Sequence, residues 1–446
     1  MQYLLGLDIG SSSVKVSLVD GGNGAIISQN FMPKEEIVIK TVIYTTFCMS
    51  FIFQFNSANG YRKFIFILFS FATIATSLKA QVAQVVEHGF LYEDTVPPTC
   101  HASTIVEADN GEMIATFFGG SYEGHPDSDI WMCRRKKTNG IWTKPKVVCD
   151  GVWTKYTAKA FSYDPEKEKI LHRDNLFDKT TWLKTAPNNA QPLFGVKVRK
   201  PCYNPVLYKL DDGDIILDYK IGSNMQDWTG WEVRSKNNGK KWSHPRMLAK
   251  ADEERHLTLG PIKNKPILNK GRIIAGSSTE VTYDSWKVHF ETSDDNGLTW
   301  TKREVNCGDI LCIQPTILSL GGSHLKALCR TRHNAVAITD SYDNGTNWTP
   351  MKLSSFPNNN SGIDAVTMSD GRHVVVYNDT NVDGRRSPLS IAISDDGEHW
   401  QKLLNIEPDD GKEYSYPSII QGKDGKLHCV YTWRRKRIAY KAIELK

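Results

Sequence analysis

An eight-residue phrase that recurs in the second half of the chain constrains its fold more than any other feature. It reads S-x-D-x-G-x-T-W at 293–300 and returns at 341–348 with Asn in place of Thr. Looser copies end at Trp242 and Trp400. Self-similarity at a spacing of about 50 residues is typical of propellers and solenoids, because one such module cannot bury its apolar face alone. The repeat therefore predicts a ring or stack of similar β-modules.

The residue types of this phrase suit a tight turn between two strands. An Asp or Asn side chain caps the turn, and Gly supplies the positive φ that the turn requires. The Trp then packs between neighbouring modules and buries a large apolar area. We expect these residues to be structural and to carry no chemistry.

A second repeat predicts the number of modules. Short strands open upstream of each phrase, and most are followed by an Asp-Gly type turn and a β-rich run, which is the pattern of a hairpin. The six openings lie at 101–105, 204–207, 265–268, 314–317, 364–367 and 416–419. They predict an all-β, six-bladed β-propeller. A strand over 82–92 is expected to complete the sixth blade, and an insertion near 153–198 is expected as a loop or small subdomain.

These phrases are Asp-box (BNR) repeats, and the chain from about Val82 onward resembles the sialidase-like six-bladed β-propellers. The resemblance implies an exported, exo-acting glycoside hydrolase that removes a terminal, acidic sugar from a glycan. It implies no cofactor. No Cys-x-x-Cys pair or Cys/His ligand spacing predicts a metal site either.

The resemblance also suggests catalytic residues. Tyr416 lies in a segment similar to the one that carries the sialidase nucleophile, with Tyr414 as an open alternative. A phenol has a pKa near 10 and needs a carboxylate to accept its proton, a role we expect for Glu280. The general acid is expected to be Asp127, with Glu123 as its rival.

Antiparallel geometry brings the start of each inner strand and the end of the second strand to one end of the ring, so polar groups should collect there. Arginine suits such a site because its planar guanidinium pairs with carboxylates in a bidentate manner. The expected substrate-binding residues are His101, Gln314, Arg330, Arg332, Asp364, Arg385 (or Arg386) and Arg434.

One departure from the sialidase pattern leaves the sugar open. The usual first-blade Arg, in a Phe-Arg-Ile-Pro motif, is missing, and the corresponding stretch is Val-Pro-Pro-Thr-Cys-His at 96–101. A uronic acid or another acidic or deoxy sugar is therefore as well predicted as sialic acid.

The N-terminal part of the chain does not belong to the repeat. Residues 3–15 resemble the opening of FGGY sugar kinases of the xylulokinase type, and this fragment spans 1–36. A linker of unclear status follows at 37–61. Residues 62–80 resemble a secretory signal with a cleavage site before Gln81, which predicts a secreted or periplasmic domain over 81–446. Their apolar run is shorter than the roughly 20 residues of a membrane span, so none is expected in the mature domain.

Charge and composition narrow the partners. A net charge of +5 over 446 residues, without a basic stripe, gives no reason to expect nucleic acid. The expected partner is a glycan, and the expected state is a monomer. Because a fold does not dictate a function, two alternatives stay open. One is a non-catalytic carbohydrate-binding propeller, and the other is a lyase or hydrolase of uronate-containing polysaccharide that uses His101, His125 or Tyr416 as acid/base.

Overall fold

The computed structural model divides the chain into two compact units, residues 1–78 and 79–446, which are described separately here. In the first unit the structure describes five short strands. In the second it describes residues 83–93, 96–155, 196–225, 228–250, 260–280, 282 and 284–445. The described residues contain no helix long and apolar enough to span a bilayer.

The first unit holds two small antiparallel sheets. Strands β1 (Tyr3–Gly10), β2 (Ser13–Asp20) and β3 (Ile26–Phe31) form one, and β4 (Ile52–Phe55) pairs with β5 (Arg62–Ile65) in the other. The kinase-like fragment stays a prediction, because three strands do not distinguish it. The signal-like segment lies mostly outside the described residues.

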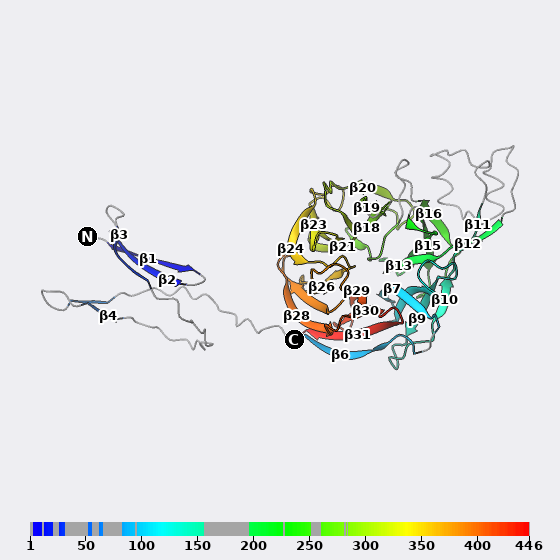
Figure 1. The fold of residues 1–446 in the computed structure, drawn as a ribbon, viewed down its shortest axis with the longest axis horizontal. Helices are drawn as coiled ribbons and strands as arrows, with labels where there is room; N and C mark the ends of the chain where they lie inside the picture. Colours follow the sequence, from blue (N-terminus) through cyan, green and yellow to red (C-terminus); the bar gives the residue numbers. More distant parts are fainter. Residues whose placement is uncertain are drawn as a thin grey trace. The chain divides into compact units, whose positions relative to one another are not determined.

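The second unit is a six-bladed β-propeller, which confirms the predicted fold class (Figure 1). Each blade is an antiparallel sheet of four strands, and the first strand named for each blade is the inner one. Blade 1 contains β7 (Thr99–Glu107), β8 (Met113–Gly120), β9 (Asp129–Arg135) and β10 (Lys146–Cys149); blade 2 contains β13 (Cys202–Lys209), β14 (Ile215–Ile221), β15 (Thr229–Ser235) and β16 (Arg246–Lys250); blade 3 contains β17 (Ile267–Asn269), β18 (Arg272–Glu280), β19 (Trp286–Ser293) and β20 (Thr301–Glu304).

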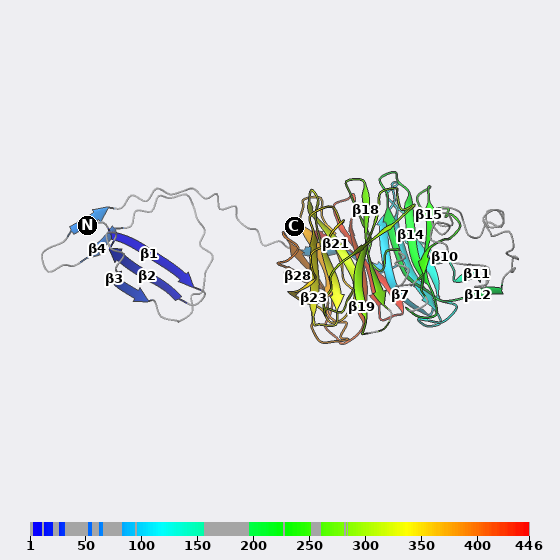
Figure 2. The same cartoon turned by 90° about the horizontal axis from the view of Figure 1, so that it is seen from above.

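The remaining three blades follow the same order along the chain. Blade 4 contains β21 (Cys312–Gly321), β22 (His324–Thr331), β23 (Ala335–Ser341) and β24 (Lys352–Pro357); blade 5 contains β25 (Asp364–Thr367), β26 (His373–Asn378), β27 (Leu389–Ser394) and β28 (Gln401–Glu407); blade 6 contains β29 (Tyr414–Gln421), β30 (Leu427–Trp433), β31 (Arg437–Leu445) and β6 (Ala83–Phe90). In Figure 2, β7, β14, β18 and β21 each run from one face of the ring to the other.

The ring is closed by a strand from the start of the propeller. Strand β6 pairs antiparallel with β31, so that Gly89 lies opposite Tyr440, and it becomes the outer strand of blade 6. This confirms the predicted closure by residues 82–92. The pairing gives β31 a partner on its outer side and leaves no gap between the first and last blades.

The Asp-boxes form the predicted turns between the third and fourth strands of their blades. In blade 3 the Ser293 hydroxyl accepts a hydrogen bond from the backbone N–H of Gly297 (2.8 Å), and the Asp295 carboxylate accepts one from the N–H of Thr299 (2.8 Å). Gly297 has a φ of +80°. These side chains replace the strand pairing that the backbone loses at the turn.

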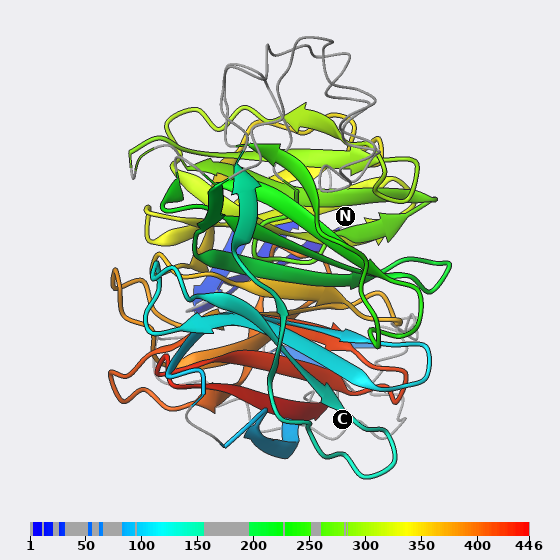
Figure 3. The same cartoon turned by 90° about the vertical axis from the view of Figure 1, so that its right-hand side faces the viewer.

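The Trp that ends each Asp-box packs between blades, as the repeat predicts. Trp348 of blade 4 stacks on Phe290 of blade 3, with ring centroids 3.6 Å apart. Trp300 packs against Ile273 and the buried aliphatic residues of blade 2. Figure 3 shows the twisted sheets of the first two blades, in cyan and green, lying side by side. The core of the molecule is therefore the set of apolar layers between adjacent blades.

The expected insertion near 153–198 lies mostly outside the described residues. Its ends are described, because β11 (Val152–Lys155) pairs antiparallel with β12 (Val196–Arg199) in a two-stranded ribbon.

Candidate active site

The inner strands of four blades share a backbone irregularity at the same level of the ring. The strand register shifts there, and one residue adopts the left-handed conformation. These residues are Ala102, Asn204, Gln314 and Tyr416, with φ between +43° and +55°. A left-handed conformation is costly for residues other than glycine, and such strain is concentrated at functional sites. Two of these residues, Gln314 of blade 4 and Tyr416 of blade 6, are hydrogen-bonded to each other.

Tyr416 of blade 6 contacts side chains from blades 1 and 4. Its hydroxyl oxygen accepts a hydrogen bond of 2.7 Å from Nη1 of Arg330 and one of 3.3 Å from Nε2 of Gln314. Arg330 and Gln314 are also bonded to each other (3.3 Å). All three residues are buried. The phenol oxygen therefore sits between two donors, neither of which can accept its proton.

His101 packs against the ring of Tyr416. The two ring centroids are 4.2 Å apart, and Nδ1 of His101 is buried with no hydrogen-bond partner in the part of the chain that the structure describes. Burial, and then the charges of Arg435, Arg386, Arg330 and Lys263, hold the pKa of this imidazole well below its usual value. His101 is accordingly neutral at neutral pH.

Two further arginines approach the same point from blades 5 and 6. The Arg386 guanidinium lies 5.6 Å from the centre of the Tyr416 ring. Arg386 is bonded to the Glu413 carboxylate (2.6 Å), and Arg435 contacts the same carboxylate (3.1 Å). Although burial opposes it, the pKa of Glu413 is lowered by these two arginines. Glu413 thus orients both cations and offsets part of their charge.

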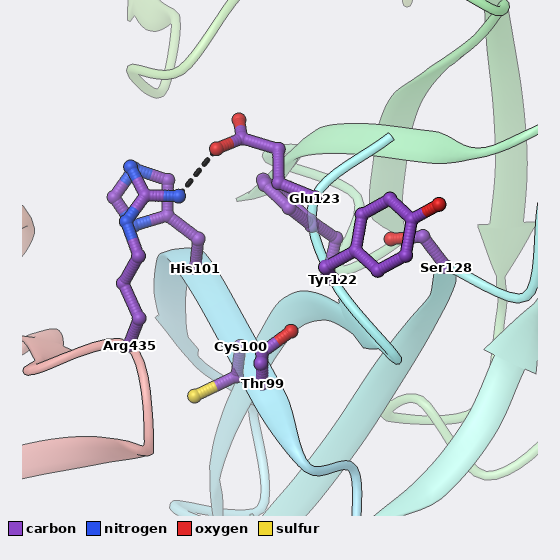
Figure 4. Close-up of a pocket in the computed structure, with 8 residues that line it drawn as sticks. Thr99, Cys100, His101, Tyr122, Glu123, Ser128 and Arg435 are labelled. Carbon is purple, nitrogen blue, oxygen red and sulfur yellow. Dashed lines mark hydrogen bonds and ion pairs between the residues drawn. The ribbon is translucent and has the colours of Figure 1, made fainter. Parts of the chain in front are cut away.

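A cavity of about 290 Å³ opens beside His101. It is lined by Thr99, Cys100, His101, Phe118, Tyr122, Glu123, Ser128 and Arg435. Figure 4 shows His101 between these side chains, with Arg435 and Glu123 joined by an ion pair across the cavity. Tyr416 does not line this cavity, but its ring packs against that of His101, which does. The space suits a ligand of about one sugar unit.

Lys263 lies in the segment before β17 and binds backbone carbonyls at the inner strands of blades 5 and 6. Its ammonium group donates to the Ile363 and Pro417 carbonyls (both 2.6 Å) and to the side chain of Asn264 (2.8 Å). Asn264 in turn donates to the carbonyl of Gln314 (3.0 Å). Gln314 and Pro417 lie within the register shifts of β21 and β29, where strand pairing is interrupted, so the pair Lys263–Asn264 holds the bulges of blades 4 and 6. Burial lowers the pKa of Lys263 to about 7.

A BNR repeat-like domain matches residues 178–429, which is more than half of the chain. The chain belongs to the BNR repeat-like domain family. Among curated proteins, none matches it. The following comparisons therefore concern solved structures, and at their level of identity they show the fold alone.

Several solved structures share the fold of this BNR repeat-like propeller. A protein of unknown function from Dyadobacter fermentans is 17% identical with a TM-score of 0.59, and the match covers 82% of this chain and 99% of that one. The NanB sialidase from Streptococcus pneumoniae is 12% identical (TM-score 0.54; 97% and 83% covered). The intramolecular trans-sialidase from Ruminococcus gnavus is 13% identical (TM-score 0.55; 80% and 96% covered).

The carboxylates expected to act in catalysis do not contact the Tyr416 hydroxyl. Glu280 is buried and bonded to Ser278 (3.0 Å). Burial raises the pKa of Glu280, while Arg330 opposes this shift. Among the described residues, Gln314 and Arg330, and not Glu280, are hydrogen-bonded to the Tyr416 hydroxyl. The role of Glu280 as the proton acceptor stays a prediction.

The two candidate acids of blade 1 differ in position. Asp127 caps its own loop, because it accepts hydrogen bonds from the backbone and hydroxyl of Ser121 (2.9 and 2.6 Å) and pairs with His125 (2.6 Å). These hydrogen bonds lower the pKa of Asp127 although burial opposes them. Glu123 lines the cavity and pairs with Arg435. The geometry therefore favours Glu123 over the expected Asp127.

Four of the predicted substrate-binding residues are engaged elsewhere. Arg332 pairs with Asp284 (3.0 Å), and Arg385 pairs with Asp409 (2.5 Å). Arg434 lies over Trp433 and donates to Tyr414 (3.3 Å). The buried carboxylate of Asp364 is shared among Thr316, Lys265 and the N–H of Ile419.

Tyr414, the alternative to Tyr416, lies apart from this cluster. Its hydroxyl donates to Asp410 (2.9 Å). The predicted residues that the structure brings together are therefore Tyr416, His101, Gln314, Arg330 and Glu123. Sequence reasoning missed Arg435, Lys263 and Glu413, and it did not choose Arg386 over Arg385. The run of basic residues that includes Arg435 was the one available signal.

The described residues include no group of three or more His, Cys, Asp and Glu side chains that could hold a metal ion.

Proposed function

We propose that this propeller is a glycan-cleaving enzyme that acts near the end of a chain, beside a sugar that carries a carboxylate. The observation that supports it best is the convergence of Arg330, Arg386 and Arg435 with Lys263 around His101 and Tyr416. Guanidinium groups bind carboxylates tightly, and a buried tyrosine and a neutral histidine beside them can transfer protons.

Exo action is part of the proposal. The cavity of about 290 Å³ has room for about one sugar unit, so a chain end fits it better than a continuous chain. The sialidases among its structural relatives support a glycan as substrate. Export, through the signal-like segment at 62–80, and a monomeric state also remain proposals.

Two forms of cleavage are compatible with such a site. The family resemblance suggests hydrolysis of a terminal acidic sugar, with Tyr416 as nucleophile. That route needs a base at the phenol oxygen, where the structure has Gln314 and Arg330 instead. The second form, elimination on a uronate, needs no base at the phenol oxygen.

The proposal is tested with sialyllactose and with oligosaccharides of hyaluronan, polygalacturonate and alginate. Neutral cellulose oligosaccharides serve as the control. Chromatography measures the released sugars for the wild type and for Tyr416→Phe. We expect release from at least one acidic glycan, none from the neutral one, and a loss of about 10²-fold or more in the variant. Binding of acidic glycans without release would instead indicate a carbohydrate-binding propeller.

A further inference from the structure

The hydrogen bonds around Tyr416 suit a proton donor better than a nucleophile. Arg330 and Gln314 both donate to the phenol oxygen, so both stabilise the phenolate that remains after the proton has left. Because neither can accept that proton, nothing in direct hydrogen-bond contact activates Tyr416 to attack a sugar carbon.

His101 has the properties of the complementary base. It lines the cavity, and its Nδ1 is buried and has no partner among the described residues. It is neutral, so one ring nitrogen carries a free lone pair. Its ring lies against that of Tyr416, at 4.2 Å between centroids. A base that lines the cavity and an acid whose ring packs against that base are thus placed side by side.

The cations around the pair prepare it for a carboxylate. Arg435, Arg386, Arg330 and Lys263 all act on His101. A bound carboxylate would offset their charge, which restores basicity to the imidazole. The same cations would stabilise the additional negative charge that develops on the carboxylate when a proton leaves the neighbouring carbon.

We infer that this site cleaves glycans by β-elimination at a uronate substituted on O4, with His101 as the base and Tyr416 as the acid. The inference rests on the proposed function and specifies both its reaction and its substrate class. A uronate has the hydrogen on the carbon next to its carboxylate that this reaction requires. Sialic acid lacks a hydrogen on the carbon next to its carboxylate, so it is not a substrate for this elimination.

The reaction balances without water as a reactant and without an oxidant. His101 takes the proton from C5 of the uronate, and the electron pair of that bond forms the C4=C5 double bond. The C4–O4 bond breaks, its electron pair stays on the oxygen, and this oxygen takes the hydroxyl proton of Tyr416. The products are an unsaturated uronate and a glycan with a free hydroxyl. Transfer of the proton from the imidazolium to the phenolate restores both residues.

The product of cleavage tests the inference. Hyaluronan, polygalacturonate and alginate oligosaccharides, which all carry O4-substituted uronates, are incubated with the whole chain, and sialyllactose serves as comparison. We expect a product that absorbs in the ultraviolet through its conjugated double bond and is one water lighter than the hydrolysis product. Saturated products would overturn the elimination and leave the proposed function intact. Intact glycans in every reaction would overturn both.

Hydrogen exchange at C5 then tests the two roles separately. In D₂O, the Tyr416→Phe variant keeps the base but lacks the acid, so we expect deuterium at C5 of the substrate without cleavage. The His101→Asn variant should lose exchange and cleavage together, by about 10²-fold or more. Tyr414→Phe is the matched control and should keep both. Exchange that persists in His101→Asn would overturn the assignment of the base, provided that thermal unfolding shows each variant to be folded.

Discussion

The phenol oxygen of Tyr416 accepts a 2.7 Å hydrogen bond from Arg330, a residue that also contacts Gln314 and Asn360 and lies over the ring of Trp286. One guanidinium therefore links strand β22 of blade 4 to the bulge of blade 6. Since Arg330 is buried, its charge acts strongly on its neighbours. The geometry of the acid in the proposed reaction depends on this contact.

Replacing Arg330 by Lys should weaken binding of an acidic sugar. Lysine keeps the charge but cannot bridge Tyr416, Gln314 and Asn360 with one planar group. We expect the affinity for a hyaluronan oligosaccharide to fall by about 10- to 100-fold in titration calorimetry. Arg332→Lys is the control, because Arg332 is partly exposed and pairs with Asp284. An equal loss in both variants would argue against a specific role for Arg330.

Gln314→Glu separates elimination from nucleophilic hydrolysis. The substitution replaces a donor to Tyr416 by a carboxylate, which disfavours the phenolate and makes Tyr416 a weaker acid. We therefore expect the rate of elimination to fall by about 10-fold or more, as measured by the ultraviolet absorbance of the product. A rate increase would mean that Tyr416 needs a base, as a nucleophile does.

Lys263 should make stability depend on pH in a characteristic direction. Its folded-state pKa is about 7, whereas an unfolded lysine titrates near 10.4. Between these values the unfolded state binds more protons, so a rise in pH relieves the cost of burying this charge and stabilises the fold. The wild type should therefore gain stability relative to Lys263→Met as the pH rises above about 7. Urea unfolding at several pH values measures this, and a constant difference would contradict it.

Titratable and charged groups that face Lys263 also shift its pKa. Asp364 raises the pKa of Lys263, as Cys429 does, and both Lys265 and Arg330 lower it. Lys326→Met is the matched control, since Lys326 is also buried but pairs with Asp340 on the other side of blade 4. Lys263→Met should also loosen the bulges at Gln314 and Tyr416, which hydrogen exchange followed by mass spectrometry can detect.

The pH dependence of cleavage should lack an acidic limb near pH 6.5, the usual pKa of histidine. Burial and the surrounding cations keep His101 neutral well below that value. We therefore expect kcat/KM to stay constant as the pH falls through about 6.5. A loss of activity centred there would mean that a group other than His101 acts as the base.

Trp348→Ala should destabilise the propeller without altering the site. The indole stacks on Phe290 between blades 3 and 4, so its removal leaves a cavity in an apolar layer. We expect a loss of about 3–5 kcal/mol in the free energy of unfolding, measured by denaturant titration. Cleavage by the folded fraction should be unchanged. A selective loss of activity would show that the Asp-box does more than shape the turn.

The fold was predictable because its determinants are local. Each Asp-box contains the residues that form its own turn, as the hydrogen bonds of Ser293 and Asp295 show. Each strand opening of the second repeat corresponds to one blade. The closing strand β6 was also foreseen, since the sixth blade lacks a fourth strand of its own. Contacts between residues far apart in the sequence cannot be predicted from such local patterns. The differences between the expected and the observed site concern contacts of this kind.

The site depends on bulges and on contacts between distant blades. A left-handed residue at Gln314 and at Tyr416 changes where each side chain points, and alternation along a strand does not reveal it. Consecutive arginines show the same difficulty, because Arg386 and Arg435 approach the site whereas Arg385 and Arg434 pair elsewhere. Glu280 was expected to accept the proton of Tyr416, whereas Gln314 and Arg330 hold the hydrogen bonds to its hydroxyl.

The most direct test of this account compares the reducing ends released from hyaluronan, polygalacturonate and alginate oligosaccharides by the wild type and by Tyr416→Phe, with Tyr414→Phe beside them. The account predicts release by the wild type and by Tyr414→Phe, and a loss of at least about 10²-fold in Tyr416→Phe. Equal release by all three proteins, or none from any acidic glycan by the folded wild type, would contradict it.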